Sequence, residues 1–174
     1  EYILIQEEVL EGQCLLALPD DDMPYFAVSM AEPVSCVYSA QTRQIHIHKE
    51  SPFAPRKPEL GILRGGTTIV AGAGAMGRMH VEMAMRYKPR NLIVSDPIPE
   101  RLEEVQTTLG EKAKQNDINL VTTLPDKLEE LLNELTDGHK ADDIILAVGI
   151  QPVQQNALKL LGKGGVANLL GGLT

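Results

Sequence analysis

The segment that most constrains the fold of this chain is Gly72–Gly77, with the sequence GAGAMG. A short β-branched run at 67–71 leads directly into it, as a buried parallel strand that ends at glycines would. After it, Met79 and Met83 continue a helical spacing, and Pro89 prevents further helix. The pattern therefore predicts a strand, a tight glycine turn and a helix in immediate succession.

Strands and helices alternate regularly after this turn. Apolar runs predict further strands at 92–95, 118–122, 144–148 and 166–170, separated by helices. Five strands joined by helices predict an α/β fold of the Rossmann type, a doubly wound parallel sheet with right-handed crossovers. The complete fold has a sixth strand, which this sequence leaves no room for. The strand at 166–170 would then be an unprotected edge. We expect either self-association through this strand, in a homo-oligomer, or its coverage by a segment of the first 66 residues.

The glycine turn has the setting that dinucleotide binding requires. It follows an apolar strand, opens a helix, and an acid, Asp96, falls at the end of the next strand. The glycines would allow the tight turn, the approach of a pyrophosphate and close packing of helix on strand. The free N–H groups and the helix dipole would then face the phosphates. The predicted cofactor contacts in the turn are Gly72, Ala73, Gly74, Ala75, Met76 and Gly77.

The choice of dinucleotide depends on Asp96. Its carboxylate can accept hydrogen bonds from the ribose hydroxyls and would repel a 2′-phosphate, so NAD(H) is favoured over NADP(H). Arg101 complicates this choice, because its guanidinium could stack beside adenine or offset the charge of a 2′-phosphate. We include both residues among the predicted cofactor contacts.

Three other interpretations of the turn and the acid stay open. The glycines could form a βα turn without a ligand, with Asp96 as a solvated acid or a cap. A methyltransferase that uses S-adenosylmethionine also combines a glycine turn with an acid after the second strand, although its third glycine is usually dispensable. A non-enzymatic NAD-sensing domain would need a partner or DNA-binding module, and the first 66 residues show no basic recognition helix.

The first 66 residues break the alternation of strands and helices. They suggest a strand at 2–5, a turn at 19–22 and a helix at 32–44. Three prolines fall within 51–58, which we interpret as a loop. We therefore expect two regions, 1–31 and an incomplete NAD(P)-binding domain at 32–174.

Composition excludes several classes of function. The 16 basic residues are scattered among 24 acids, and a net charge of -8 argues against a nucleic-acid partner. No apolar run approaches the ~20 residues that cross a bilayer, and no leader opens the chain, so we expect a cytoplasmic protein without a membrane partner. Cys14 and Cys36 are too far apart to indicate a metal set, and we interpret them as reduced thiols.

Beyond the turn, two segments carry a family resemblance: Glu32–Ala40, with the sequence EPVSCVYSA, and Glu1–Ile5, with the sequence EYILI. With them the chain resembles the zinc-containing medium-chain dehydrogenase/reductase family, in particular its sorbitol dehydrogenase, threonine dehydrogenase and L-sorbose 1-phosphate reductase branches. The resemblance implies that 1–31 is a remnant of a GroES-like catalytic barrel. It matches Glu32 to the catalytic acid at zinc, as ligand or as partner of the zinc-bound water. The loops that it places at the nicotinamide half contain Val148, Gly149, Leu170 and Gly171.

The resemblance also implies a reaction. Zinc would polarise a carbonyl or alcohol while a hydride passes between nicotinamide and a sugar or sugar-phosphate substrate. The chain lacks the family's Gly-His-Glu motif, its upstream zinc-binding cysteine and its four-cysteine lobe. We therefore expect a fragment, truncated at both ends, of an oxidoreductase that acts on CH–OH groups. Such a fragment would bind no zinc and would be inactive.

Three histidines need a separate interpretation. His46 and His48 would point to the same side of a strand, but without a nearby third ligand we interpret them as surface residues beside a loop. His80, near the start of the helix after the glycine turn, is interpreted as a packed or solvent-facing residue rather than a cofactor contact.

Overall fold

The chain folds as two compact units, Glu1–Glu32 and Pro33–Thr174. The computed structural model describes residues 4–18, 20 and 22–172 of them. The first unit contains α1 (Glu7–Glu11) and α2 (Tyr25–Ser29), neither of which has a buried residue. The expected strand at 2–5 and turn at 19–22 lie partly outside the described residues; of the strand, residues 4 and 5 have no regular structure. The expected helix exists as α3 (Ala31–Thr42), which begins in the first unit.

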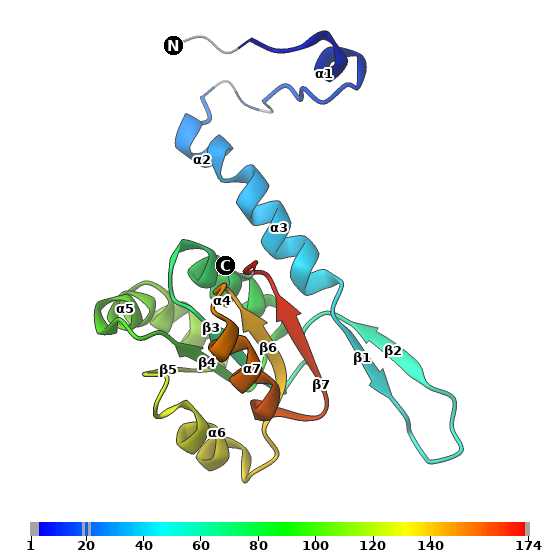
Figure 1. The fold of residues 1–174 in the computed structure, drawn as a ribbon, viewed down its shortest axis with the longest axis vertical. Helices are drawn as coiled ribbons and strands as arrows, with labels where there is room; N and C mark the ends of the chain where they lie inside the picture. Colours follow the sequence, from blue (N-terminus) through cyan, green and yellow to red (C-terminus); the bar gives the residue numbers. More distant parts are fainter. Residues whose placement is uncertain (1–3, 19, 21, 173–174) are drawn as a thin grey trace. The chain divides into compact units, whose positions relative to one another are not determined.

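The second unit is built on the parallel sheet that the alternation predicts (Figure 1). Its strands lie in the order β5-β4-β3-β6-β7, with the strand before the glycine turn in the middle. From β3, the chain adds β4 and β5 on one side and then β6 and β7 on the other. This is the Rossmann arrangement without a sixth strand. The strands are β3 (Thr67–Ala71), β4 (Asn91–Ser95), β5 (Asn119–Thr123), β6 (Ala141–Leu146) and β7 (Leu161–Leu169).

Helices cover both faces of this sheet (Figure 1). Val70 of β3 packs with α4 and α5, whereas Ile69 and Ala71 pack on the opposite face with α6 and α7. Because successive strand residues point to opposite faces, burial on both sides produces the continuous apolar runs in the sequence. The helices are α4 (Ala75–Ala84), extended by the 3-10 turn η1 (Met85–Tyr87), α5 (Pro99–Gln115), α6 (Leu128–Thr136) and α7 (Gln151–Leu160). Within the described residues, no helix has the length and apolar character that a membrane span needs.

A β-hairpin encloses the loop that was expected at 51–58, and the loop itself ends before Lys57. Strands β1 (Ile45–His48) and β2 (Lys57–Leu60) pair antiparallel, and Pro58 lies inside β2 opposite Ile47. The loop prediction was therefore wrong at its end. A two-stranded sheet consists of edge strands, where a residue without an N–H group is tolerated, so the proline did not exclude a strand.

Candidate functional site

The turn between β3 and α4 has two tight glycines and one open glycine. Gly72 has a φ of 104°, in the left-handed region that favours glycine, and its N–H donates to the carbonyl oxygen of Ser95 at 2.7 Å. A Cβ on Gly77 would overlap the carbonyl oxygen of Gly72. A Cβ on Gly74, by contrast, would meet no neighbouring atom within 4 Å. The turn is therefore tightly packed at Gly72 and Gly77 and has free space beside Gly74.

The amino end of α4 begins at this open position. Gly74 is the N-cap, no side chain caps the helix, and the N–H of Arg78 donates to the carbonyl oxygen of Gly74 at 2.9 Å. The first N–H groups of an α-helix have no partner within the helix. Together with the helix dipole they favour an anion at this end. The geometry therefore fits a phosphate group beside Gly74.

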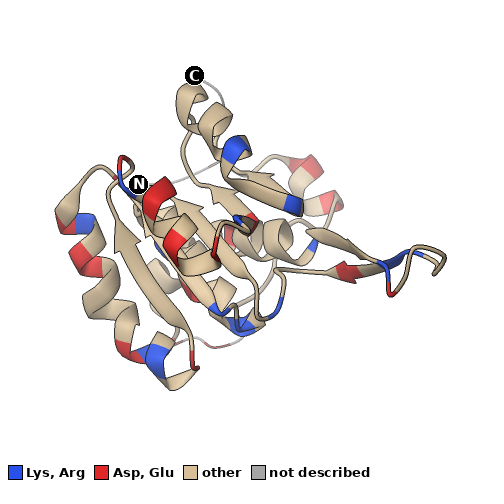
Figure 2. Cartoon of the chain, turned by 90° about the horizontal axis from the view of Figure 1, so that it is seen from below, with Lys and Arg blue, Asp and Glu red and all other residues tan. Residues whose placement is uncertain are grey.

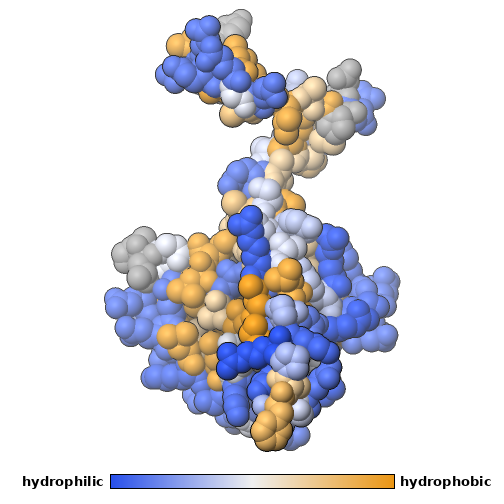
Figure 3. Space-filling model, turned by 90° about the vertical axis from the view of Figure 1, so that its right-hand side faces the viewer, coloured by the Kyte–Doolittle hydropathy of each residue, from blue (hydrophilic) through white to orange (hydrophobic). Residues whose placement is uncertain are grey.

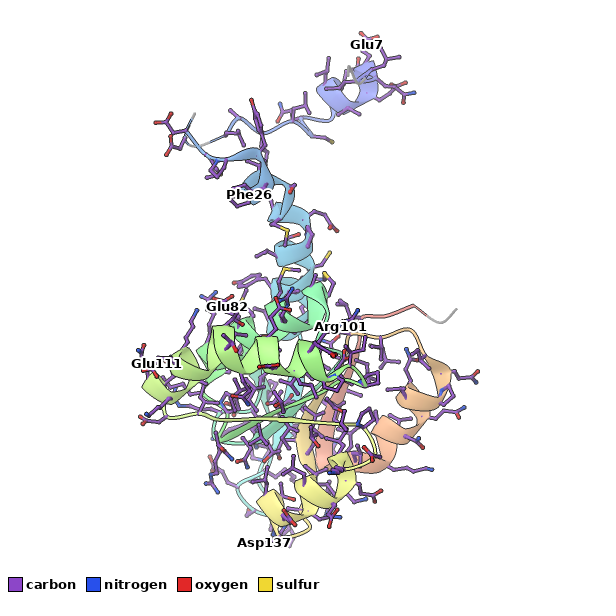
Figure 4. The ribbon with its side chains drawn as sticks, turned by 90° about the vertical axis from the view of Figure 1, so that its left-hand side faces the viewer. Glu7, Phe26, Glu82, Arg101, Glu111 and Asp137 are labelled. Atoms are coloured by element: carbon purple, nitrogen blue, oxygen red, sulfur yellow. The ribbon has the colours of Figure 1, made fainter. Side chains whose placement is uncertain are left out.

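Asp96 connects the glycine turn to the loop after β4. The residue is 2% exposed, its Oδ2 accepts the N–H of Ala73 at 2.8 Å, and its Oδ1 accepts the N–H of Ile98 at 2.9 Å. A carboxylate has about four acceptor positions, so these two bonds leave positions for ligand hydroxyls. The Nη1 atom of Arg101 lies 3.6 Å from Oδ2 of Asp96, and the arginine, at the start of α5, is about half exposed (Figure 4).

The loops after β6 and β7 meet at the same edge of the sheet. The Nε2 atom of Gln154 donates to the carbonyl oxygens of Val148 and Gly171, at 3.3 and 3.1 Å. A Cβ on Gly72 would come within 2.8 Å of Cγ1 of Val148, so the glycine turn also adjoins this pair of loops. The structure therefore brings together the predicted residues of three loops, with Gly149 and Leu170 in the same two segments.

A mostly apolar pocket of about 450 Å³ opens beside these loops. Gly72 and Val148 line one end of it, together with Pro97, which follows Asp96. From there it runs over the sheet face between Leu128 of α6 and Val153 of α7. The sequence analysis missed the pocket residues of α6 and α7, because their apolar spacing is the same as that of ordinary core residues.

Glu32 is the remaining predicted site residue. It occupies the first turn of α3 and belongs to the first unit, which holds no other predicted site residue. No group of three or more His, Cys, Asp or Glu side chains among the described residues is arranged to hold a metal ion. The described residues therefore do not by themselves form a zinc site.

His46 is not the surface residue that the sequence analysis expected. It is 3% exposed, and its Nε2 lies 2.8 Å from Oδ1 of Asp143, which is completely buried in β6. Burial raises the pKa of Asp143, against the opposing effects of the Leu63 N–H and of His46. An acid within the apolar strand sequence ADDIIL was the available signal, since a buried carboxylate needs partners. His48 is exposed beside Glu59, with 3.1 Å between Nε2 and Oε2.

His80 is buried, which is one of the two positions expected for it, packed or facing solvent. Its side chain is fully buried against α3, with Nδ1 3.0 Å from Nε2 of Gln41. Burial lowers the pKa of His80 from 6.5 to about 4, because the charged imidazolium would lose its hydration. The imidazole is therefore neutral at pH 7 and has no access to a ligand.

Two curated proteins resemble the chain in sequence. Mannitol-1-phosphate 5-dehydrogenase of Aliivibrio fischeri (strain ATCC 700601 / ES114) is 31% identical over 124 residues, which are 69% of this chain and 28% of that protein. L-sorbose 1-phosphate reductase of Klebsiella pneumoniae is 32% identical over 98 residues, 55% of this chain and 22% of that protein. The chain thus spans less than a third of the length of either relative. No family model matches it.

Solved structures show the same fold. Alcohol dehydrogenase TADH from Thermus sp. ATN1 superposes with a TM-score of 0.64 and 22% identity, covering 88% of this chain and 38% of the enzyme. Zinc dependent alcohol dehydrogenase 2 from Streptococcus pneumonia superposes with a TM-score of 0.64 and 21% identity, covering 88% of this chain and 38% of that enzyme. A putative zinc-binding dehydrogenase from Sinorhizobium meliloti 1021, solved with NADP, superposes with a TM-score of 0.58 and 16% identity, covering 83% of this chain and 36% of that protein. The chain is therefore homologous to mannitol-1-phosphate dehydrogenase and L-sorbose 1-phosphate reductase and has the fold of zinc-dependent alcohol dehydrogenases, which confirms the expected resemblance to the medium-chain dehydrogenase/reductase family.

Proposed function

We propose that the second unit binds NAD(H) at the carboxyl edge of its sheet and is the cofactor-binding part of an oxidoreductase that acts on CH–OH groups. The observation that carries this proposal is the combination of an open Gly74 at an uncapped helix start with Asp96 bonded to the Ala73 N–H. The two features support a phosphate site and a ribose acceptor on the same turn.

Each half of the dinucleotide has residues to receive it. The first amides of α4 would hold the pyrophosphate at Gly74, and the free acceptor positions of Asp96 would take the ribose hydroxyls. The apolar pocket beside Pro97 has the chemistry for adenine. The loops at Val148 and Gly171 would contact the nicotinamide half, which supplies or accepts the hydride when bound.

The negative charge of Asp96 supports NAD(H) over NADP(H), because it opposes a 2′-phosphate. The sugar-phosphate substrate class is supported by the names of the two relatives, mannitol-1-phosphate 5-dehydrogenase and L-sorbose 1-phosphate reductase. A role of Glu32 at a catalytic zinc belongs to the same proposal. The close packing of Gly77 on Gly72 favours the dinucleotide over S-adenosylmethionine, whose binding turns can dispense with the third glycine.

The open glycine allows a test that leaves the fold intact. Gly74→Ala adds one methyl group where no neighbouring atom lies within 4 Å, so the unfolding midpoint should not change. The same methyl group would stand in the space proposed for the pyrophosphate, and we expect NADH affinity to fall at least about tenfold, which is about 1.4 kcal/mol. Calorimetry of the full chain with NADH, NADPH and S-adenosylmethionine measures the affinities.

The matched control is Gly110→Ala, which adds the same methyl group in α5, away from the turn. Its NADH affinity should equal that of the original chain. The proposal fails if Gly74→Ala binds NADH as tightly as the control does, or if S-adenosylmethionine binds and NADH does not.

A further inference from the structure

Gln154, near the start of α7, joins the two loops that follow β6 and β7. Its side chain is buried, and its Nε2 atom donates to the carbonyl oxygens of Val148 and Gly171, at 3.3 and 3.1 Å. A side-chain amide nitrogen carries two hydrogens, so these two bonds use both of its donors. The N–H of Gln154 also donates to the carbonyl oxygen of Ile150 at 3.1 Å. One residue thus holds two carbonyl groups that belong to different loops.

The two loops are in close backbone contact beside this side chain. The N–H of Gly171 donates to the carbonyl oxygen of Leu146 at 3.1 Å, where the pairing of β6 with β7 ends. Beyond that point, a Cβ on Gly149 would overlap the carbonyl oxygen of Gly172, and a Cβ on Gly171 would overlap the carbonyl group of Val148. No side chain of the two loops separates these backbones, so their relative position depends on direct packing and on the shared donor.

The topology of the sheet gives these loops a place in the proposed cofactor site. The strand order reverses at β3, with β4 on one side of it and β6 on the other. In doubly wound sheets a dinucleotide lies across such a switch point, outside the carboxyl ends of the strands. The proposed phosphate site at Gly74 follows β3, and the proposed ribose acceptor Asp96 follows β4. The nicotinamide half would therefore extend towards the loops after β6 and β7.

The chemistry of the loops matches a neutral group. Residues 144–158 and 164–172 include no Asp, Glu, Lys or Arg, and they are tan in Figure 2. Ile150 and Leu169 are 55% and 58% exposed, and apolar residues form part of the side of the second unit that Figure 3 shows. Backbone polar groups beside apolar side chains suit a nicotinamide, which is a planar ring with an uncharged carboxamide.

We propose that Gln154 is a positioning residue for the nicotinamide half of the cofactor. Its amide occupies one acceptor position on each of the carbonyl oxygens of Val148 and Gly171, and a carbonyl oxygen has two. The second positions point in directions that are fixed before the ligand arrives, which lowers the entropy cost of binding. Gln154 acts through these two carbonyls and not by contact with the cofactor. This role rests on the proposed NAD(H) site and adds a requirement that concerns the nicotinamide alone.

The test compares NADH with ADP-ribose, which contains the adenosine, the pyrophosphate and the second ribose but no nicotinamide. Gln154→Met keeps an unbranched side chain of similar length and removes both donors. By calorimetry on the full chain, NADH affinity should fall about tenfold and ADP-ribose affinity by less than about twofold, because only the nicotinamide loops lose hydrogen bonds. The fluorescence emission of bound NADH, which reports the surroundings of the nicotinamide ring, should move towards that of free NADH.

Gln155→Met is the matched control, because Gln155 is the next residue of α7 and is exposed. It should keep both affinities and the emission of bound NADH. Gln154→Glu has nearly the shape of glutamine, but its carboxylate would face two carbonyl oxygens, so its NADH affinity should fall at least as far as that of Gln154→Met. This variant provides the comparison if the methionine variant does not fold.

Equal losses of NADH and ADP-ribose affinity would show that Gln154 has only a structural role, and unchanged NADH affinity in both Gln154 variants would show that it has no role in binding. The positioning role is also overturned if the original chain binds NADH no more tightly than ADP-ribose and with the emission of free NADH. In that case Gly74→Ala should still weaken ADP-ribose binding, and the proposed function would stand. If the original chain binds neither ligand, both the positioning role and the proposed function fail.

Discussion

Two buried aspartates, Asp96 and Asp143, occupy different ends of the same sheet and are held in different ways. Asp96 follows the carboxyl end of β4 and accepts hydrogen bonds from two backbone N–H groups, those of Ala73 and Ile98. Asp143 lies in the first half of β6, where its carboxylate contacts the side chains of Gln44 and His46 as well as the N–H of Leu63.

The difference separates a site from a structural anchor. The backbone donors of Asp96 belong to a turn with open space at Gly74, so a ligand can approach the same turn. The donors of Asp143 are two side chains and one backbone N–H group, all from the segment before β3, and its carboxylate is completely buried. In the proposed function the first carboxylate recognises a ligand, whereas the second joins the hairpin to the sheet.

Substitution at the anchor should have the largest effect on stability. Asp143→Ala removes a buried carboxylate and leaves His46, Gln44 and the N–H of Leu63 without their partner. Breaking a buried pair by removing one member costs about 3–5 kcal/mol. We expect a decrease of that size in the free energy of unfolding, measured by urea denaturation.

Glu103→Ala is the control, because Glu103 is an exposed acid of α5. Its effect should stay within about 0.5 kcal/mol. If Asp143→Ala also changes stability by less than about 1 kcal/mol, the buried network is not an anchor. Should that variant not fold, Asp143→Asn keeps the volume and some of the hydrogen bonds and should show a smaller loss.

His80 should make the second unit sensitive to acid, through the packing of α4 on α3. Its pKa is about 4 in the folded chain and 6.5 as the reference value, so folding favours the neutral imidazole. The stabilisation is fully present above pH 6.5 and is lost as the pH falls from 6.5 towards 4. The shift corresponds to about 3 kcal/mol. Unfolding free energies measured between pH 7 and pH 4 should show this loss.

Other groups also titrate in this range, so the comparison needs variants. His80→Gln should reduce the acid-dependent loss, whereas replacement of the exposed His139 by Gln should leave it unchanged. Titration of the His80 imidazole by NMR in the original chain gives an independent reading. An imidazole that becomes protonated near pH 6.5 would show that burial does not control its charge.

The two aspartates also show what the sequence could reveal. Asp96 was predictable, because local order along the chain defines its setting: strand, glycine turn, helix, strand, acid. The sheet was predictable for a similar reason, since burial on both faces makes each central strand a continuous apolar run. The position of β3 at the centre follows from the rules for right-handed crossovers.

The partners of Asp143 were not predictable in the same way. His46 and Gln44 reach it from about a hundred positions away in sequence, and β1 does not alternate with apolar residues inward. The hairpin was missed because the three prolines of 51–58, which exclude a regular helix, were interpreted as a loop throughout, although an edge strand such as β2 tolerates Pro58. The pocket between α6 and α7 was missed because lining residues and core residues share one spacing.

Substitution of Asp96 should change cofactor affinity more than stability, the reverse of what we expect for Asp143. Of the three residues Asp143, His80 and Asp96, it should have the smallest effect on the free energy of unfolding. Asp96→Asn keeps the shape of the side chain, but its amide group can no longer accept both the Ala73 and the Ile98 N–H, so stability should fall by about 1 kcal/mol. The charged acceptor proposed for the ribose is also lost, and NADH affinity should fall by about 1–3 kcal/mol. NADPH affinity should fall less, because the repulsion of the 2′-phosphate disappears while Arg101 remains.

Calorimetry with both cofactors measures this contrast. The control is Asp143→Asn, which should keep its NADH affinity when folded. Equal losses of NADH and NADPH affinity would show that Asp96 does not select the cofactor and only stabilises the glycine turn.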